Sequence, residues 1–333
     1  MKVWELGEFG LIELIAKTVG KCSRSDLVLG IGDDTAAWRT EKSVQLATTD
    51  ILIQDVHFTL NVATWRELGW KALAVNISDI AAMGGTPSFA LVSLGFPPET
   101  EVNNVIELYH GMKELAKKFN VDIVGGNISR APVVILDVSL IGKASGNLLT
   151  RSVAAPGDQI AVTGYLGQSA AWLRMLKSGL KFDRKTTAFL REAHLRPQPR
   201  VAEGQILVQH GVRAAIDLSD GLISDLTHIC KASRVGAKVW IDKLPIHELL
   251  KASFKKEVRG LALSGGEDYE LLFTTKSRVI TELTNIMSTP ITVIGEILSD
   301  ASGQITLLDE QGKVVKWTEH GWDHFKSPRR GKP

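Results

Sequence analysis

The sequence predicts an α/β (α+β) protein with two domains built on mixed sheets. Short apolar runs, typical of strands, alternate with longer amphipathic segments, typical of helices. The length of 333 residues is more than one domain usually needs. A small, polar and turn-rich stretch over residues 143–157 separates two halves with different patterns. We therefore expect one domain over residues 1–145 and a second over residues 146–333.

The first half begins with an expected helix over residues 5–20 and a short apolar run ending at Leu29. A second helix is expected from Thr64, because Thr64 and Glu67 have the spacing of a capping box, and it should stop before residues 84–85. A third amphipathic helix covers about 100–119. Strands are expected over residues 44–47, 88–96, 121–126 and 133–141, the third of them ending in a glycine pair.

The second half continues the alternation with a strand over residues 160–163 and a helix over 169–180. The segment 194–200, rich in Arg and Pro, should break the chain between helices. A strand over 214–216 leads into an acidic turn and a helix that runs through Cys230. Further strands are expected near residues 237–241, 268–275, 291–297 and 304–308.

Composition excludes several function classes. The chain is 44% hydrophobic and 23% charged with a net charge of +2, so no strongly basic surface for nucleic acid or membrane is indicated. No apolar run reaches the roughly 18 residues of a membrane span, and the N-terminus does not resemble a signal peptide. The two cysteines occupy unrelated contexts, which favours a reducing cytoplasm.

Acidic residues follow several predicted strands and interrupt one predicted helix. Asp34 and Asp50 come after the first two apolar runs, and Asp217 and Asp220 repeat this pattern in the second half. Asp79 lies within an otherwise apolar helix. Gathered carboxylates repel one another and need a cation, and oxygen ligands without a His or Cys set favour Mg²⁺. The set predicts several Mg²⁺ ions around phosphates, although each residue could instead form a turn or bond a backbone amide.

Glycine-rich turns at residues 125–126 and 164–167 could supply backbone amides to an anion. The sequence contains no P-loop motif, no protein-kinase HRD or DFG motif, no GxGxxG after a strand and no GxSxG. Nucleotide chemistry on a different scaffold remains as the interpretation.

From residue 8 to about 325 the sequence carries, in order, GIGDD, TTD followed by His57, KALAVNISDIAAMG, a Gly-Gly-Asn turn, TRSVAAPGD, TGYLGQSAA, HLRPQPR, IDLSDGLISDL, SGGEDYEL and GWDHF. These motifs resemble the thiamine-monophosphate kinase family. GIGDD and SDIAAMG also occur in the wider superfamily of aminoimidazole ribonucleotide synthetases, whereas the last three motifs together point to the thiamine enzymes.

The resemblance implies an N-terminal mixed-sheet domain that dimerises and a C-terminal α/β domain packed behind it, of the aminoimidazole ribonucleotide synthetase type. It implies that ATP and thiamine monophosphate react to give thiamine diphosphate and ADP in the cytoplasm. No general base is required, because the acceptor is an ionised phosphate. The transfer would be assisted by Asp50, Asp79 and Arg151.

The resemblance also assigns individual residues. Metal ligands are implied at Asp34, Thr48, Thr49, Asp50, Asp79, Asn127, Asp217 and Asp220. Contacts to ATP are implied at Tyr109, Gly126, Asn127, Arg151 and Ser219. Substrate contacts are implied at His57, Glu267 and Trp322, where the aromatic face of the last would meet a cationic ring. Many members of the family carry Asp where this chain has Asn127, so the metal site here has one charge fewer.

Two alternatives remain open from the sequence. One is a related ATP-using synthetase with another acceptor, such as a ribonucleotide amidine or selenide; the polar surroundings of Cys22 disfavour selenide chemistry. The other is a regulator that binds nucleotide and Mg²⁺ without catalysis. Formation of thiamine diphosphate from ATP and thiamine monophosphate would separate all three.

Overall fold

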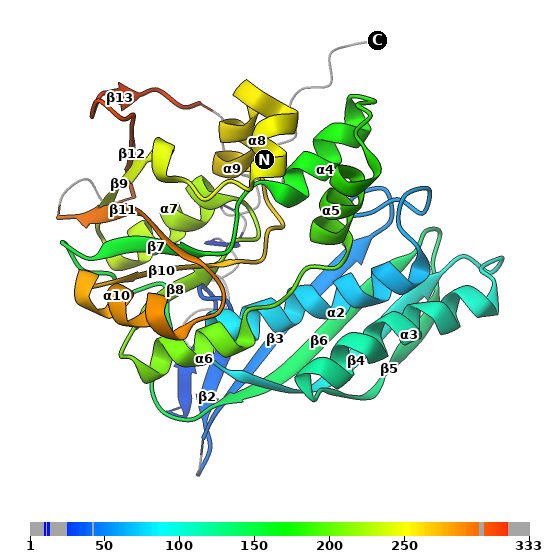
Figure 1. Cartoon of the computed structure of the whole chain (residues 1–333). Coiled ribbons are helices and arrows are strands. Elements are labelled where there is room, and N and C mark those ends of the chain that lie inside the picture. The colour runs from blue at the N-terminus through cyan, green and yellow to red at the C-terminus, as the bar shows by residue number, and fades with distance from the viewer. Residues whose placement is uncertain (1–9, 11, 14–24, 42, 300–302, 319–333) are drawn as a thin grey trace.

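The computed structural model describes residues 10, 12–13, 25–41, 43–299 and 303–318. Most of the helix predicted over residues 5–20 lies outside these residues, and so does Trp322, one of the predicted substrate contacts. Figure 1 shows one sheet formed by the first part of the chain and another formed by the second part, with helices packed on both. The predicted α/β class with two mixed sheets is confirmed.

The N-terminal sheet has six strands in the order β1-β2-β3-β6-β4-β5. All neighbours in it are antiparallel except β4 and β5, which are parallel. The strands are β1 (Leu27–Leu29), β2 (Ala36–Arg39), β3 (Val44–Ile53), β4 (Thr86–Phe96), β5 (Asp122–Arg130) and β6 (Ile135–Ala144). Helices α2 (Trp65–Ala82) and α3 (Val102–Phe119) lie side by side over one face of this sheet (Figure 1).

Helix α2 begins as the sequence predicts, with Thr64 as its N-cap and Glu67 completing the capping box. It crosses α3 so closely that a Cβ atom at Gly69 would overlap the Leu108 carbonyl, and one at Gly111 would overlap the Arg66 carbonyl. Glycine at both crossing points lets the two backbones touch. As a result α2 is buried on most sides and becomes the central element between the two halves.

The C-terminal sheet has seven strands in the order β13-β12-β9-β11-β7-β10-β8, antiparallel except where β12 runs parallel to β9. The strands are β7 (Gln159–Thr163), β8 (Ala214–Asp217), β9 (Gly236–Trp240), β10 (Leu271–Thr275), β11 (Ile291–Leu298), β12 (Ile305–Leu308) and β13 (Val314–Val315). Its helices are α4 (Gln168–Lys177), α5 (Arg184–Leu195), α6 (Val201–Gln209), α7 (Leu222–Ser233), α8 (Glu248–Phe254), α9 (Val258–Ser264) and α10 (Ser277–Ile286).

The two halves meet along α2, which contacts α5, α6 and β8 of the second half (Figure 1). The segment 194–200 breaks the chain between α5 and α6, as predicted, and braces this junction. The Trp70 indole N–H donates to the Pro197 carbonyl at 2.9 Å, and the Arg196 guanidinium lies 4.2 Å from the Trp70 ring centre. Burial of Trp70 against this segment fixes α2 relative to the C-terminal domain.

Three details of the sequence prediction are wrong. Strand β3 continues to Ile53, so Asp50 lies within the strand rather than after it. Strand β5 likewise does not end at Gly125 and Gly126 but continues to Arg130. Its register with β4 shifts at a bulge just before this glycine pair, and a Cβ at Gly126 would overlap the Val92 carbonyl. The last of the three strands, β10, starts only at Leu271, because residues 265–270 cross over to the loop after β8 instead of pairing in the sheet.

Among the helices in the described part of the chain, we find none with the length and apolar character needed to span a membrane.

Candidate active site

Three carboxylates from distant parts of the sequence meet at the junction of the two halves. One oxygen from each of Asp34, Asp79 and Asp217 lies within 4.8 Å of the others. Asp34 comes from the loop between β1 and β2, Asp79 from the C-terminal part of α2 and Asp217 from the end of β8. The convergence of carboxylates from both halves, predicted from the sequence, is therefore present.

Arg151, in the segment between β6 and β7, pairs with the first of these carboxylates. Its Nη2 lies 2.6 Å from Asp34 Oδ1 and its Nε 3.3 Å from Asp34 Oδ2, a two-pronged contact. Asp33 supports the pair, because it accepts hydrogen bonds from the backbone N–H groups of Asp34 and Arg151. Burial alone would lower the pKa of Arg151, but the charges of Asp34 and Asp33 raise it.

Strand β3 adds further oxygen groups beside α2. The Thr48 hydroxyl donates to Asp79 Oδ2, and the carboxyl groups of Asp50 and Asp79 hydrogen-bond each other. Burial raises the pKa of Asp50 to about 6, and the bond from Asp79 opposes this rise. These contacts place Asp50 and Thr48 directly against the three-carboxylate cluster.

The loop after β8 brings more acidic groups to the same place. The Ser78 hydroxyl of α2 donates to Asp217 Oδ2 at 2.6 Å, joining the two halves. Asp225, on the first turn of α7, accepts from the backbone N–H groups of Asp220 and Gly221 at 3.2 and 3.0 Å. Sequence reasoning missed Asp225, although its place five residues after Asp220 at the start of a helix was a usable signal.

The cluster is electrostatically unfavourable without a cation. Burial raises the pKa of Asp217 to about 8, and repulsion from Asp34 adds to the effect. Burial and repulsion from Asp50, Asp217 and Asp34 raise the pKa of Asp79 as well. Four carboxyl groups held this close cannot all be ionised unless positive charge is added. Hydroxyl and carboxylate oxygens form the donor set, which is the preference of a hard divalent cation.

These raised pKa values predict how metal-free stability depends on pH. Burial raises the pKa of Asp217 from an ordinary 3.8 to about 8 in the folded state. Between these two pH values Asp217 is therefore protonated in the folded protein and ionised in the unfolded chain. Stability should therefore fall as pH rises from about 4 to about 8. Chemical unfolding in EDTA across this range measures it. In Asp217→Asn the fall should be shallower; an unchanged pH slope in that variant would contradict the assignment.

The loop of residues 265–270 carries Glu267 to the edge of the cluster. The Glu267 backbone N–H donates to the Ser219 carbonyl at 2.7 Å, so the predicted substrate contact and the predicted ATP contact lie side by side. Burial would raise the pKa of Glu267, but the neighbouring Lys71 lowers it, with smaller contributions from His194 and His57. Sequence reasoning missed the buried partner of Glu267, Lys71 on α2, although a lysine inside an apolar helix is itself a signal.

Two other predicted metal ligands, Thr49 and Asn127, lie away from the carboxylate cluster. The Thr49 side chain points to the opposite face of the sheet from Asp50, since successive strand residues alternate, and it bonds Asp137 and Ser139. Ile51 on β3 shares a cross-strand row with Asn127 on the edge strand β5, three strand spacings or about 14 Å away.

Two further predicted ATP contacts also come from the N-terminal half. Gly126 lies beside Asn127 on β5, and Tyr109 is half-buried on α3 against the N-terminal core, where burial raises its pKa. The roles of these residues stay predictions.

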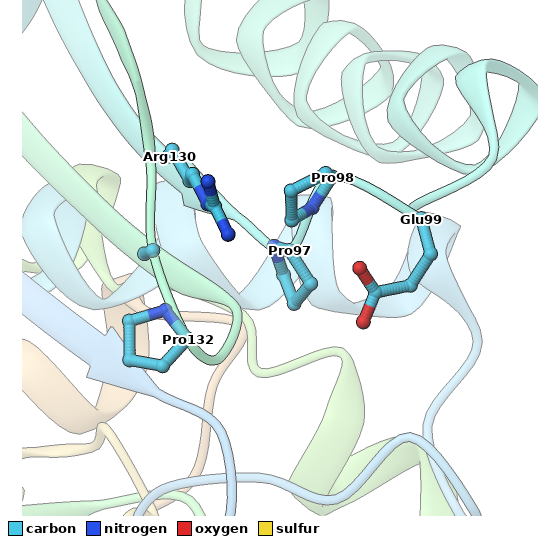
Figure 2. Close-up of a pocket in the computed structure, with 6 residues that line it drawn as sticks. Pro97, Pro98, Glu99, Arg130 and Pro132 are labelled. Carbon is cyan, nitrogen blue, oxygen red and sulfur yellow. The ribbon is translucent and has the colours of Figure 1, made fainter.

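A surface pocket of about 440 Å³ lies at the far ends of β4 and β5. Figure 2 shows the Arg130 side chain directed toward Pro97 and Pro98, with Pro132 below it. Among the described residues that line this pocket, only Arg130 and Glu99 are charged, so these residues offer no cluster of carboxylates that could bind a metal ion. The carboxylate cluster at the junction of the halves is therefore the better candidate for the active site.

Comparison with known proteins supports this choice. Two family models match the chain: the N-terminal domain of AIR synthase related proteins over residues 32–144 and the C-terminal domain over residues 155–307. The thiamine-monophosphate kinase of Bacillus subtilis (strain 168) is 36% identical over 329 residues, covering 96% of this chain and all of the relative. That of Escherichia coli (strain K12) is 38% identical over 330 residues, covering 97% and 99%.

Solved structures agree. One described as AaThiL complexed with AMPPCP and TMP matches with a TM-score of 0.86 at 35% identity, over 97% of this chain and 99% of that one. The thiamine-monophosphate kinase from Stenotrophomonas maltophilia K279a matches with a TM-score of 0.75 at 34% identity, over 91% and 96%. From family models, relatives and structures together, the chain belongs to the thiamine-monophosphate kinase family.

Proposed function

We propose that this protein transfers the terminal phosphoryl group of ATP to the phosphate of thiamine monophosphate, giving thiamine diphosphate and ADP. The observation that carries the proposal is the convergence of Asp34, Asp79 and Asp217 beside Arg151. The kinase relatives and the structure that binds AMPPCP and TMP support it. In the transfer, the bond from phosphorus to the ADP oxygen breaks as an oxygen of the acceptor phosphate forms a new one.

Several Mg²⁺ ions fit the residues present. The donor set is oxygen only, and Asp34 and Asp217 are buried while Asp79 is partly buried. Burial and mutual repulsion raise the pKa of Asp79 and Asp217, as expected of a site that added positive charge would stabilise. We assign the ions to Asp34, Thr48, Asp50, Asp79, Asp217 and Asp220. Thr49 and Asn127, whose side chains lie apart from this group, stay predicted ligands. When bound, Mg²⁺ would neutralise phosphate oxygens that otherwise repel one another.

Side chains of the protein itself position the two phosphates and neutralise part of their charge. The acceptor phosphate is already ionised at neutral pH, so it needs no base. Two like charges 4 Å apart repel by about 4 kcal/mol at an effective dielectric of 20. Arg151, fixed by Asp33 and Asp34, offers a guanidinium to this charge, and its rigid pairing holds the group in place before substrate arrives. Asp50 and Asp79 would assist by holding the cations beside the phosphates.

Both domains contribute contacts to both substrates in this proposal. ATP contacts come from Tyr109, Gly126, Asn127, Arg151 and Ser219, and thiamine monophosphate contacts from His57, Glu267 and Trp322. Residues 1–145 carry ATP and Mg²⁺ binding and dimerisation, and residues 146–333 complete the nucleotide and substrate site. A cytoplasmic location and the absence of nucleic-acid and membrane partners stay predictions.

We also propose a homodimer that packs through the open face of the N-terminal sheet. Helices α2 and α3 cover the other face, and the uncovered face exposes Ile51, Phe89, Leu91 and Val124. An apolar sheet face of this kind is typical of an interface. Gly126 and Asn127 lie among these residues, so such packing would place both predicted ATP contacts between the two copies.

Leu91→Asp is expected to convert this dimer to a monomer. Leu91 is 43% exposed on the open face, and a buried, unpaired carboxylate there would oppose association. Ile286→Asp is the matched control, because Ile286 is 52% exposed on α10 of the other domain. Light scattering after size exclusion gives the mass of each. A wild type that is monomeric, or a Leu91→Asp variant that is still dimeric, would contradict the proposed interface.

The reaction itself is tested by incubating the protein with ATP, Mg²⁺ and thiamine monophosphate and following the products by ³¹P NMR. We expect the diphosphate resonances of thiamine diphosphate to grow together with those of ADP. Asp217→Asn is the matched inactive control. Release of inorganic phosphate without thiamine diphosphate would refute the assigned acceptor.

A further inference from the structure

A buried lysine lies directly behind the predicted substrate contact Glu267. Lys71, in the middle of α2, is 1% exposed, and its ammonium lies 2.6 Å from Glu267 Oε1. A lysine is rarely buried so completely unless it is paired. The Glu267 side chain retains 25% exposure, so one side of its carboxylate is held from within while the other is accessible.

The second oxygen of Glu267 faces a buried histidine. His194 Nδ1, at the end of α5, lies 3.4 Å from Glu267 Oε2 and 2.8 Å from the Ser169 hydroxyl, while its Nε2 lies 3.5 Å from the Lys71 ammonium. Burial and the Lys71 charge lower the pKa of His194 to about 3, so the imidazole is neutral. Because Lys71 can only donate, Nε2 must accept, which puts the proton on Nδ1, facing Ser169 and Glu267.

The backbone of Glu267 is held as firmly as its side chain. Its φ of +66° is unusual for a residue other than glycine, and its N–H bonds the Ser219 carbonyl at 2.7 Å. At Gly266, a Cβ would overlap that same carbonyl. Unfavourable backbone geometry persists only where the surroundings enforce it, and it concentrates at functional sites.

We propose that Lys71 and His194 are positioning residues that fix the Glu267 carboxylate in the direction of thiamine monophosphate. The inference rests on the proposed function and extends it, since Lys71 comes from the N-terminal half and Glu267, His194 and Ser169 from the C-terminal half. The group of Lys71, His194 and Glu267 therefore links substrate recognition to the junction of the domains. Held in this way, Glu267 accepts hydrogen bonds from N–H donors of the substrate without first having to be ordered.

The test compares Lys71→Met, Glu267→Gln and the double variant. Each single change should raise KM for thiamine monophosphate by about 10-fold or more, the range for a hydrogen bond to a charged group, with KM for ATP and kcat changed much less. Because Lys71 acts through Glu267, the double variant should be no worse than Glu267→Gln alone. The dissociation constant of thiamine monophosphate, measured by calorimetry without ATP, should follow the same order.

A structural role alone gives different results. A purely structural role would lower the melting temperature of Lys71→Met while leaving KM and the dissociation constant unchanged. Independent roles would make the effects of the two single changes multiply in the double variant. Either result overturns the proposal. Arg191→Met is the matched control, because Arg191 pairs with Glu67 at 2.6 Å across the same junction without contacting Glu267. Its KM for thiamine monophosphate should match the wild type.

Should Lys71→Met fail to fold, His194→Gln replaces it, since this change leaves the Lys71–Glu267 pair intact. The same rise in KM is then expected, and an unchanged KM overturns the proposal. A wild type that binds thiamine monophosphate but does not phosphorylate it refutes the proposed function, while the dissociation constants still decide the role of Lys71. A wild type that does not bind it refutes both.

Discussion

Asp79→Ala is expected to remove almost all turnover while leaving the protein folded. Asp79 is the carboxylate that touches Asp50 and Thr48 and lies within 4.8 Å of Asp34 and Asp217 oxygens. Its loss should reduce kcat by more than the roughly 10–100-fold typical of losing an outer partner of a metal ligand. Steady-state rates at saturating ATP and thiamine monophosphate measure the effect.

Stability should change in the opposite direction. Burial, together with repulsion within the cluster, raises the pKa of Asp79, so removing this carboxyl group should raise the melting temperature of the metal-free protein at pH 8. Glu310→Gln, an exposed carboxylate in the turn between β12 and β13, is the control and should change neither quantity. Wild-type rates in Asp79→Ala would exclude Asp79 from the active site.

Arg151→Ala should have the second largest effect, on both rate and stability. Its guanidinium makes two contacts with Asp34, and its removal leaves Asp34 and Asp33 without their positive partner. Breaking a buried pair by removing one member costs up to about 3–5 kcal/mol. We expect a lower melting temperature, a fall in kcat and a rise in KM for ATP, measured by calorimetry and steady-state kinetics.

Arg151→Lys tests the geometry of the same contact. A lysine keeps the charge but cannot reproduce the two-pronged pairing, so it should restore stability better than activity. Arg174→Ala is the matched control, because Arg174 pairs with Glu257 at 2.8 Å where both side chains are about half exposed. A similar loss of activity in Arg174→Ala would show that the effect of Arg151 is unspecific.

The acidic centre of the site could be predicted from the sequence because each carboxylate carried a local signal. Asp34 and Asp217 follow apolar strands, and Asp79 interrupts an apolar helix where an unpaired charge is costly. Such signals depend only on neighbours in the chain. The helix start at Thr64 and the break at residues 194–200 were predicted for the same reason.

The other parts of the site depend on contacts between distant residues. No local pattern shows that Lys71 meets Glu267, 196 positions later, or that residues 265–270 leave the sheet to bind the loop after β8. Strand register also depends on contacts between residues that are distant in the sequence. The face on which Thr49 and Asn127 lie follows from which strands pair and where β5 bulges, and a shift of one residue would reverse it.

Diffraction from crystals grown with Mn²⁺ in place of Mg²⁺, recorded at a wavelength where manganese scatters anomalously, tests the central claim most directly. We predict an anomalous peak for a manganese ion coordinated by carboxylate oxygens of Asp34, Asp79 and Asp217. We expect this peak to be absent from crystals of Asp79→Ala. Anomalous peaks at other positions only, with these three carboxylates uncoordinated, would contradict the account.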